Sequence, residues 1–335
     1  MSIGESMRFV LFCILIISIL LMSCQNDNAV RAKMIQVVFT SYAGASAQLQ
    51  NVRHLAESIR TFGGKYSEAP IRVYCPQVLI DSETVLIEKL GAFNVEVKPV
   101  VIPNEASWFY LGGMVFSAAA AEADASGVAT VLVFMGSDTI VLQEPEEFIL
   151  AEGKSLGYRP VFHKNISLLY SEPLDEYWKR VYADMNIKES SIFPMVTPAD
   201  DDTIRPYFNA ACLSVRPEKG LFARWAETFT ALNKDSVLMS LCENDFFKRV
   251  FTFQVALSGT ILNNIARDEM VELSNRINYP IFFKEMYGAK HDFHDITGIT
   301  TIRYEQFFEK PIPGWDTILT GPADRIAWLK KSFEE

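Results

Sequence analysis

Short apolar runs alternate along the first half of the chain with segments whose apolar residues recur at helical spacing. The runs are rich in β-branched residues and predict buried strands at 34–40, 71–75, 94–102 and 130–135. The segments between them predict a helix that Ser46 caps and Gly63 ends, and further helices at 83–90 and 108–125. Strands that alternate with helices in this way indicate an α/β fold with a mostly parallel central sheet covered on both faces.

The second half of the chain is less regular. The strands and helices predicted there cover 157–163, 174–185, 208–215, 221–232, 245–257 and 322–333. We find no internal repeat and no Pro/Gly-rich linker, which favours one continuous domain from residue 34 to residue 335. A division near residue 150 is the alternative.

An uncharged apolar run, 9–22, follows a basic residue near the N-terminus. It is shorter than the roughly 20 residues that a helix needs to cross a bilayer, and its flanks are typical of a signal peptide. The stretch Leu21-Met22-Ser23-Cys24 resembles a lipobox. We therefore expect a lipoprotein signal peptide at 1–23, a lipid on Cys24 and a tether at 24–33, which predicts a membrane-anchored protein in the periplasm or on the cell surface. The alternative is an uncleaved N-terminal anchor with the body in the cytosol.

The chain carries a formal net charge of −10 and five cysteines. Nucleic acids and anionic membrane surfaces bind basic patches, so neither is expected as a partner of an acidic chain. One cysteine lies in the leader and one is the predicted lipid site. The other three, Cys75, Cys212 and Cys242, have apolar or aromatic neighbours and predict buried thiols rather than a disulfide framework.

The turn Gly136-Ser137-Asp138 is the segment best suited to bind a ligand. A buried strand enters this small polar turn, and the chain then resumes as a short apolar run, 139–142. In parallel sheets, ligands bind beyond the carboxyl ends of the strands. The arrangement resembles the Asp-x-Asp turn of GT-A glycosyltransferases, in which two carboxylates hold Mg²⁺ or Mn²⁺ against the diphosphate of a nucleotide-sugar. A capped turn without a ligand is the alternative.

Further segments resemble the same family in the same order, from residue 34 to about residue 310. They are Thr40-Ser41-Tyr42, Tyr207-Phe208-Asn209-Ala210-Ala211 with Arg216-Pro217 after it, Phe253-Gln254-Val255-Ala256-Leu257, Asn278-Tyr279-Pro280 and Thr301-Ile302-Arg303-Tyr304.

The resemblance implies a GT-A-like, Rossmann-like fold with a donor half at about 34–150 and an irregular acceptor half at about 151–310. It places Asp138 at the donor, with Asn209 and Gln254 in the sugar and acceptor pocket. The other residues that it places on the donor side are Thr40, Tyr42, Gly136, Ser137 and Arg303.

The chain departs from the family pattern where a metal would be held. Gly136 stands in place of the first Asp, and Arg303 stands in place of a His that helps hold the metal. Ala211 replaces a Gly, and Phe253 replaces the Asp before Gln254. Of three implied metal ligands only Asp138 remains. Either the enzyme is metal-independent and Arg303 pairs with the diphosphate directly, or the fold has lost transferase activity and keeps only binding.

His291-Asp292-Phe293-His294-Asp295 is a second candidate metal cluster. Histidines three residues apart fit one face of a helical turn, and neutral imidazole binds Zn²⁺ or Mn²⁺. His291 or His294 could then replace the histidine that is missing at Arg303. The alternative is a solvated polar loop, and we also expect Asp200-Asp201-Asp202 to be a solvated turn.

The leading hypothesis for function is transfer of a hexose from a nucleotide-sugar to a glycan or lipid-linked acceptor. Nucleotide-sugars are cytosolic, whereas a lipoprotein is exported, so two alternatives remain. One is a catalytically inactive GT-A-like lipoprotein that binds glycan or a partner protein. The other is a two-lobed solute-binding lipoprotein, which fits the anchor but not the signatures at 136–138 and 208–210.

Overall fold

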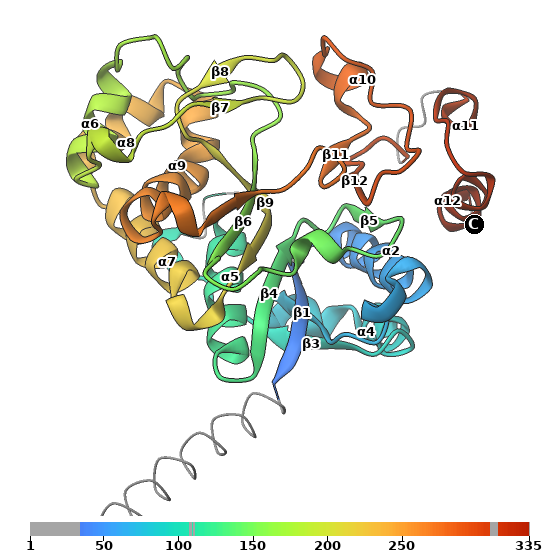
Figure 1. Cartoon of the computed structure of the whole chain (residues 1–335). Coiled ribbons are helices and arrows are strands. Elements are labelled where there is room, and N and C mark those ends of the chain that lie inside the picture. Colours follow the sequence, from blue (N-terminus) through green and yellow to red (C-terminus); the bar gives the residue numbers. More distant parts are fainter. Residues whose placement is uncertain (1–33, 107–108, 110, 309–313, 335) are drawn as a thin grey trace, which may run out of the picture.

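The structure is a computed structural model that describes residues 34–106, 109, 111–308 and 314–334 (Figure 1). The signal peptide, the lipid on Cys24 and the tether that the sequence predicts lie outside these residues. Within the described ranges, no helix is both long and apolar enough to span a membrane.

A seven-stranded sheet forms the centre of the molecule, in the order β10-β6-β9-β4-β1-β2-β3. Its strands are β1 (Ile35–Tyr42), β2 (Ile71–Cys75), β3 (Val95–Pro99), β4 (Ala129–Met135), β6 (Leu156–Pro160), β9 (Phe208–Val215) and β10 (Met270–Glu272). All neighbouring pairs are parallel except those of β9, which runs antiparallel to β4 and to β6. The predicted mostly parallel sheet is confirmed.

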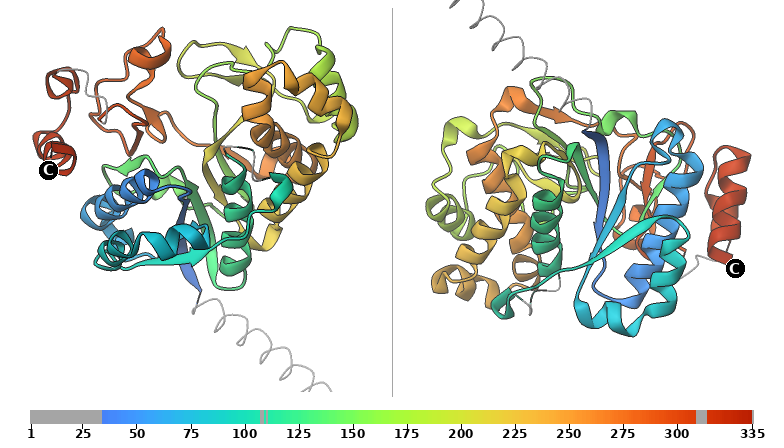
Figure 2. Two further views of the ribbon diagram at one scale, coloured as in Figure 1. Left: turned by 180° about the vertical axis from the view of Figure 1, so that it is seen from behind. Right: turned by 90° about the horizontal axis from the view of Figure 1, so that it is seen from below.

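Helices cover both faces of this sheet (Figure 2). One face carries α2 (Ser46–Phe62), α3 (Gln77–Ser82) and α4 (Thr84–Gly91). The other carries α5 (Gly112–Ala125), α6 (Glu176–Asp184), α7 (Leu221–Leu232), α8 (Ser236–Glu243) and α9 (Phe246–Asn264). Each face has its own apolar core, and the three cysteines of the body are buried free thiols, as predicted.

The prediction that Ser46 caps α2 is wrong. Ala45 holds the N-cap position in extended conformation, and no side chain caps the helix. Ser46 is the first helical residue, and its hydroxyl donates instead to the carboxylate of Glu83, which precedes α4. The serine therefore joins two neighbouring helices rather than closing the end of one.

A second sheet, β11-β12-β5, lies beside the carboxyl end of β4. Its strands are β5 (Thr139–Val141), β11 (Tyr279–Pro280) and β12 (Thr301–Arg303), and a two-stranded sheet is formed by β7 (Met195–Val196) and β8 (Thr203–Ile204). The short helix α10 (Phe283–Tyr287) follows β11, and the last helices are α11 (Trp315–Ile318) and α12 (Ala323–Glu334).

The C-terminal helix α12 packs against α2 through aromatic rings. The ring centroids of Phe62 and Trp328 lie 5.5 Å apart, and those of His54 and Phe333 lie 4.3 Å apart. Both pairs meet edge to face, and they hold the C-terminal helix α12 against α2.

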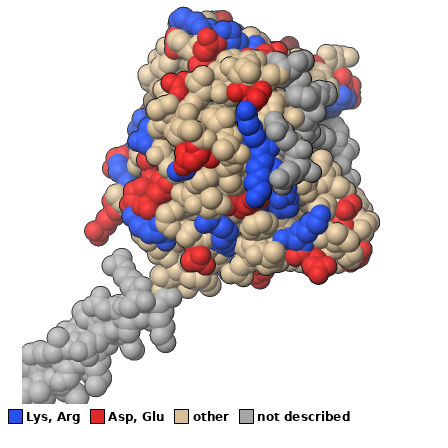
Figure 3. All heavy atoms as spheres, turned by 90° about the vertical axis from the view of Figure 1, so that its right-hand side faces the viewer, with Lys and Arg blue, Asp and Glu red and all other residues tan. Residues whose placement is uncertain are grey.

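On the face of the molecule shown in Figure 3, Lys and Arg side chains lie among Asp and Glu side chains.

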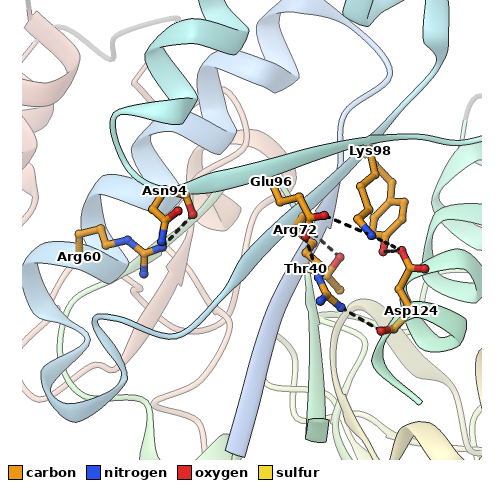
Figure 4. A network of polar contacts seen from close by, with 8 residues as sticks. Thr40, Arg60, Arg72, Asn94, Glu96, Lys98 and Asp124 are labelled. Carbon is orange, nitrogen blue, oxygen red and sulfur yellow. Dashed lines mark hydrogen bonds and ion pairs between the residues drawn. The ribbon is translucent and has the colours of Figure 1, made fainter. Parts of the chain in front are cut away.

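A polar network ties the edge strand β3 and its neighbour β2 to the end of α5 (Figure 4). The carboxylate of Asp124 accepts hydrogen bonds from Tyr74 Oη at 2.7 Å and from Lys98 Nζ at 2.9 Å. Arg72 donates to the carbonyl of Asp124 at 3.1 Å and pairs with Glu96 at 3.0 Å. Because Tyr74 is almost fully buried, this network satisfies a hydroxyl that would otherwise lose its hydrogen bond with water.

Helix α7 is capped by a side chain from another helix. Its N-cap residue, Gly220, has φ 64° and no side chain to offer. The buried Glu122 of α5 accepts a hydrogen bond through Oε2 from the backbone NH of Ala223 at 2.9 Å. Burial raises the pKa of Glu122, although the NH groups at the start of α7 favour its charged form. The contact fixes α7 against α5 below the sheet.

We expect Glu122→Ala to lower the free energy of unfolding by about 1–2 kcal/mol, the usual cost of losing a helix cap. Glu122→Gln keeps an oxygen acceptor without a charge. Because the folded-state pKa of Glu122 lies above its unfolded value, its stabilising effect is lost as the pH rises through the folded pKa. Thermal melts across a pH series should therefore show the wild type losing stability relative to Glu122→Gln as the pH rises. If the difference in melting temperature between the wild type and Glu122→Gln does not change with pH, this account of Glu122 is wrong.

Candidate functional site

The turn 136–138 lies where β4 passes into β5, and its acid faces Arg303 of β12. Nη2 of Arg303 lies 2.8 Å from Oδ1 and 2.9 Å from Oδ2 of Asp138. The backbone NH of Glu305 donates to Oδ2 at 3.1 Å, and the NH of Tyr304 donates to the carbonyl of Asp138, also at 3.1 Å. Only 12% of the Asp138 side chain and 11% of the Arg303 side chain are exposed. Two residues that the resemblance places on the donor side thus form one buried ion pair.

Gly136 makes room for this ion pair. A Cβ atom at Gly136 would lie 2.9 Å from Cζ of Arg303, 2.9 Å from Oδ1 of Asp138 and 3.1 Å from Nη1 of Arg303. Non-bonded heavy atoms are at their optimum near about 3.5–4.0 Å, so even an alanine would displace the pair. A carboxylate at position 136 and the guanidinium in its present place exclude each other.

Glu305 is a residue of the site that the sequence did not indicate. It lies half-buried beside the ion pair, with a left-handed backbone φ of 44°. Burial and the neighbouring charge of Asp138 raise the pKa of Glu305 to about 7, while Arg303 and a hydrogen bond with Tyr287 lower it. Glu305 follows the matched segment 301–304, so no motif marks it. It adds a group that titrates near neutral pH to the edge of the site.

Strand β9 brings Asn209 to the same edge of the sheet. The backbone NH of Gly136 donates to the carbonyl of Ala211 at 2.9 Å, and Asn209 lies two residues before Ala211. Phe208 and Ala210 pack in the core under α7 and α9, so the alternation along the strand turns Asn209 to the opposite face. Oδ1 of Asn209 accepts a hydrogen bond from the NH of Ala211 at 3.0 Å. Asn209 of β9 and Asp138, in the turn after β4, therefore lie at the same end of two neighbouring central strands.

Gln254 approaches β9 from α9. Its Oε1 accepts a hydrogen bond from the backbone NH of Ala210 at 3.4 Å, one residue away from Asn209. Phe253, which stands where the resemblance implies an Asp, is buried in the apolar core, and its carbonyl accepts a hydrogen bond from Nε1 of Trp225 at 2.7 Å. A carboxylate at position 253 would have no polar surroundings, so this departure from the family pattern fits the packing.

The predicted donor residues of β1 are engaged within the fold. Oγ1 of Thr40 donates to the carbonyl of Arg72 at 3.0 Å. Tyr42 is half-buried, and its hydroxyl lies in the space that a Cβ atom at Gly44 or Gly113 would need. Both residues lie at the carboxyl half of β1, whose neighbour β4 ends in the turn 136–138. This shared edge is the part of the prediction that the geometry supports.

A cavity of about 400 Å³ lies beside β11, the strand next to β12, and neither residue of the ion pair lines it. Its lining includes Arg159, Asp201, Asn278, Tyr279, His291 and Phe293. Pro280, which also lines it, is the strand partner of Arg303. Oδ2 of Asp201 lies 2.8 Å from Nε2 of His291 and 2.6 Å from Nζ of Lys290. The acidic turn 200–202 and the histidine loop, which the sequence presented as separate features, therefore meet at this cavity.

The described side chains do not fit a divalent cation. Both oxygens of Asp138 face the guanidinium of Arg303, whose positive charge would repel a metal ion. His291 pairs with Asp201, whereas Nε2 of His294 lies 2.6 Å from Oε1 of Glu285, so the two imidazoles do not share a site. No group of three or more His, Cys, Asp or Glu side chains within the described ranges is placed to hold a metal ion.

One family model matches the chain. The family model described as the Rhodobacterales glycosyltransferase domain matches residues 45–263, a segment that includes Asp138, Asn209 and Gln254 and ends before Arg303. A comparison with curated proteins gives no match.

Three solved structures illustrate the structural similarity. The galactosyltransferase LgtC, in complex with donor and acceptor sugar analogues, is 13% identical, with 90% of this chain and 96% of that chain covered at a TM-score of 0.48. Mouse xyloside xylosyltransferase 1 is 10% identical, with 83% and 99% covered at 0.45. Core-mannan synthase A from Aspergillus fumigatus, in its Mn/GDP form, is 8% identical, with 71% and 72% covered at 0.43.

We expect Glu305 to make stability depend on pH near neutrality. Its folded-state pKa of about 7 lies above the unfolded value, so the stability it contributes is complete below the unfolded pKa and is lost as the pH rises through about 7. The melting temperature of the wild type should fall relative to Glu305→Gln over this range. The melting temperature of the exposed control Glu227→Gln should change with pH as that of the wild type does. If the curve of Glu305→Gln runs parallel to both, the carboxyl of Glu305 is already ionised over this range and the expectation is wrong.

Proposed function

Because the chain belongs to the Rhodobacterales glycosyltransferase family, we propose that it transfers a hexose from a nucleotide-sugar to a glycan or lipid-linked acceptor. The observation that carries this proposal is the position of the turn 136–138. It lies at the carboxyl end of β4, between Arg303 on one side and Asn209 on the other. This is the edge at which open α/β sheets bind their ligands.

The donor diphosphate would lie against the turn and Arg303. Gly136 and Ser137 are small, so a ligand can approach the backbone closely, and a guanidinium pairs well with phosphate oxygens. Thr40 and Tyr42 lie at the end of the adjacent strand, on the side where the resemblance implies the base and ribose. Together these residues support a donor site that spans the ends of β1 and β4.

The acceptor would occupy the cavity beyond β11. The rings of Tyr279 and Phe293, whose centroids lie 5.1 Å apart, offer an apolar surface, and carboxylates and amides surround it. Nδ2 of Asn278 is buried and has no hydrogen-bond partner in the described part of the chain, so a sugar hydroxyl would satisfy it. A volume of about 400 Å³ suits a small ligand, and Pro280 places the cavity next to Arg303.

We expect UDP or GDP to raise the melting temperature of the full-length protein. A nucleotide present at about 100 times its dissociation constant stabilises by roughly 2.7 kcal/mol. Transfer of the hexose from a nucleotide-sugar should then release the nucleoside diphosphate. Asn278→Ala should raise the acceptor KM about 2- to 12-fold without changing the donor KM, because the substitution removes one neutral hydrogen bond. Asn264→Ala, an exposed change at the far end of α9, is the matched control.

The outcome also separates the proposed transferase from an inactive relative. Glycan binding without any nucleotide binding would contradict hexosyl transfer and favour a GT-A-like domain that only binds glycan or a partner protein. A nucleotide-induced shift of the melting temperature that persists in Asn278→Ala, together with an unchanged acceptor KM, would leave the donor assignment in place and show that the cavity is not the acceptor site.

We further propose that the protein is an exported lipoprotein anchored through Cys24, on the basis of the apolar run and the lipobox resemblance in its sequence. Palmitate should label the wild type but not Cys24→Ala. Cys13→Ala, a change within the leader, should keep the label because that segment is removed. Equal labelling of all three proteins would contradict the anchor. A labelled protein that also uses nucleotide-sugars would need a donor supply outside the cytosol.

A further inference from the structure

The relation between Gly136 and Arg303 explains why the site lacks metal ligands. We propose that the guanidinium of Arg303 is a built-in cation that takes the place of a divalent metal, and that Gly136 is the change that makes room for it. The inference rests on the proposed function, because it concerns the donor side of the same site. It adds that the donor diphosphate is neutralised without a metal ion.

The first argument is steric. The guanidinium carbon lies 2.9 Å from the position of a Cβ atom at Gly136, and Nη1 lies 3.1 Å from it. The volume that a first carboxylate of an Asp-x-Asp turn would use is therefore already filled. The two departures from the family pattern, which lie far apart in the sequence, are adjacent in space and depend on each other.

The second argument is charge balance. Two carboxylates and a divalent cation sum to zero, and so do the single carboxylate of Asp138 and the single charge of Arg303. Loss of one acid at position 136 thus matches the exchange of a doubly charged ion for a singly charged side chain. A metal ion added to the present pair would leave an uncompensated charge in a site that is almost closed to water.

The third argument is an unused donor. Arg303 is 9% exposed, and its Nε has no hydrogen-bond partner among the residues that the structure describes. A buried donor without a partner costs free energy, which an anionic oxygen would recover. The neighbouring buried arginine, Arg159, is engaged differently, since it donates to the carbonyl of Leu273 and to Asn275. Arg303 is therefore the arginine suited to meet a diphosphate.

The experiment compares full-length wild type, Arg303→Ala and the double variant Gly136→Asp/Arg303→His, with the exposed Arg276→Ala as control. Free Mn²⁺ is followed by electron paramagnetic resonance, and UDP and GDP are titrated with and without EDTA.

We expect the wild type and Arg276→Ala to leave Mn²⁺ free and to bind nucleotide equally well with and without EDTA. Arg303→Ala should bind nucleotide roughly 10- to 150-fold more weakly. The double variant should bind about one Mn²⁺ per chain and lose nucleotide affinity in EDTA.

A second measurement tests the steric relation without any ligand. Gly136→Ala should lower the melting temperature of the wild type by about 2–4 °C or more, and by less in the Arg303→Ala background, where only the close approach of Oδ1 of Asp138 remains. Equal shifts in both backgrounds would overturn the steric claim.

Two further outcomes are decisive. Stoichiometric Mn²⁺ binding by the wild type that Asp138→Asn abolishes would overturn the proposal, and so would a double variant that binds no Mn²⁺. If no protein binds nucleotide but the Mn²⁺ and melting results hold, the replacement of the metal by Arg303 stands. In that case the neutralisation of a donor diphosphate by Arg303 and the proposed transfer reaction both fail.

Discussion

The buried ion pair between Asp138 and Arg303 joins the turn at the end of β4 to strand β12 of the second sheet. Asp138 receives two contacts from the guanidinium and one from the NH of Glu305, and its carbonyl binds the NH of Tyr304. Charges this deeply buried are costly unless each has its partner, so removing either side chain would leave an unpaired buried charge. The last part of the chain thereby acquires a defined place above the end of β4.

The same contact determines which chemistry the edge can support. With Arg303 paired to Asp138, the turn presents the hydrogen-bond donors of a guanidinium whose charge is balanced, rather than a set of oxygen ligands. Glu305 adds a carboxyl whose ionisation near neutral pH changes the net charge beside the pair. The cavity next to Pro280 supplies aromatic rings and amides. In the proposed function, the donor site at the turn and the acceptor site in this cavity would lie on neighbouring elements of the second sheet.

The sequence predicted the regular elements well and the contacts between distant segments poorly. β2, β9 and α7 match their predicted ranges, because their apolar patterns are strong and clearly bounded. α3 and α8 were missed, since each is short and its apolar residues cannot be told from a loop or strand by spacing alone. Asp138 and Arg303 were found through motifs. Local patterns do not encode how β5 pairs with β12. That pairing determines the contact between the two side chains, the space at Gly136 and the position of Glu305 beside the ion pair.

The direction of β1 determines how far the turn 136–138 lies from the point where the chain enters the body. The strand begins at Ile35 on the edge opposite the turn 136–138, and its eight residues span about 26 Å. If the proposed anchor precedes Ile35, the chain enters the body at the end of β1 opposite the turn 136–138. The ligand-binding residues then lie one strand length farther from the point of attachment than Ile35 does.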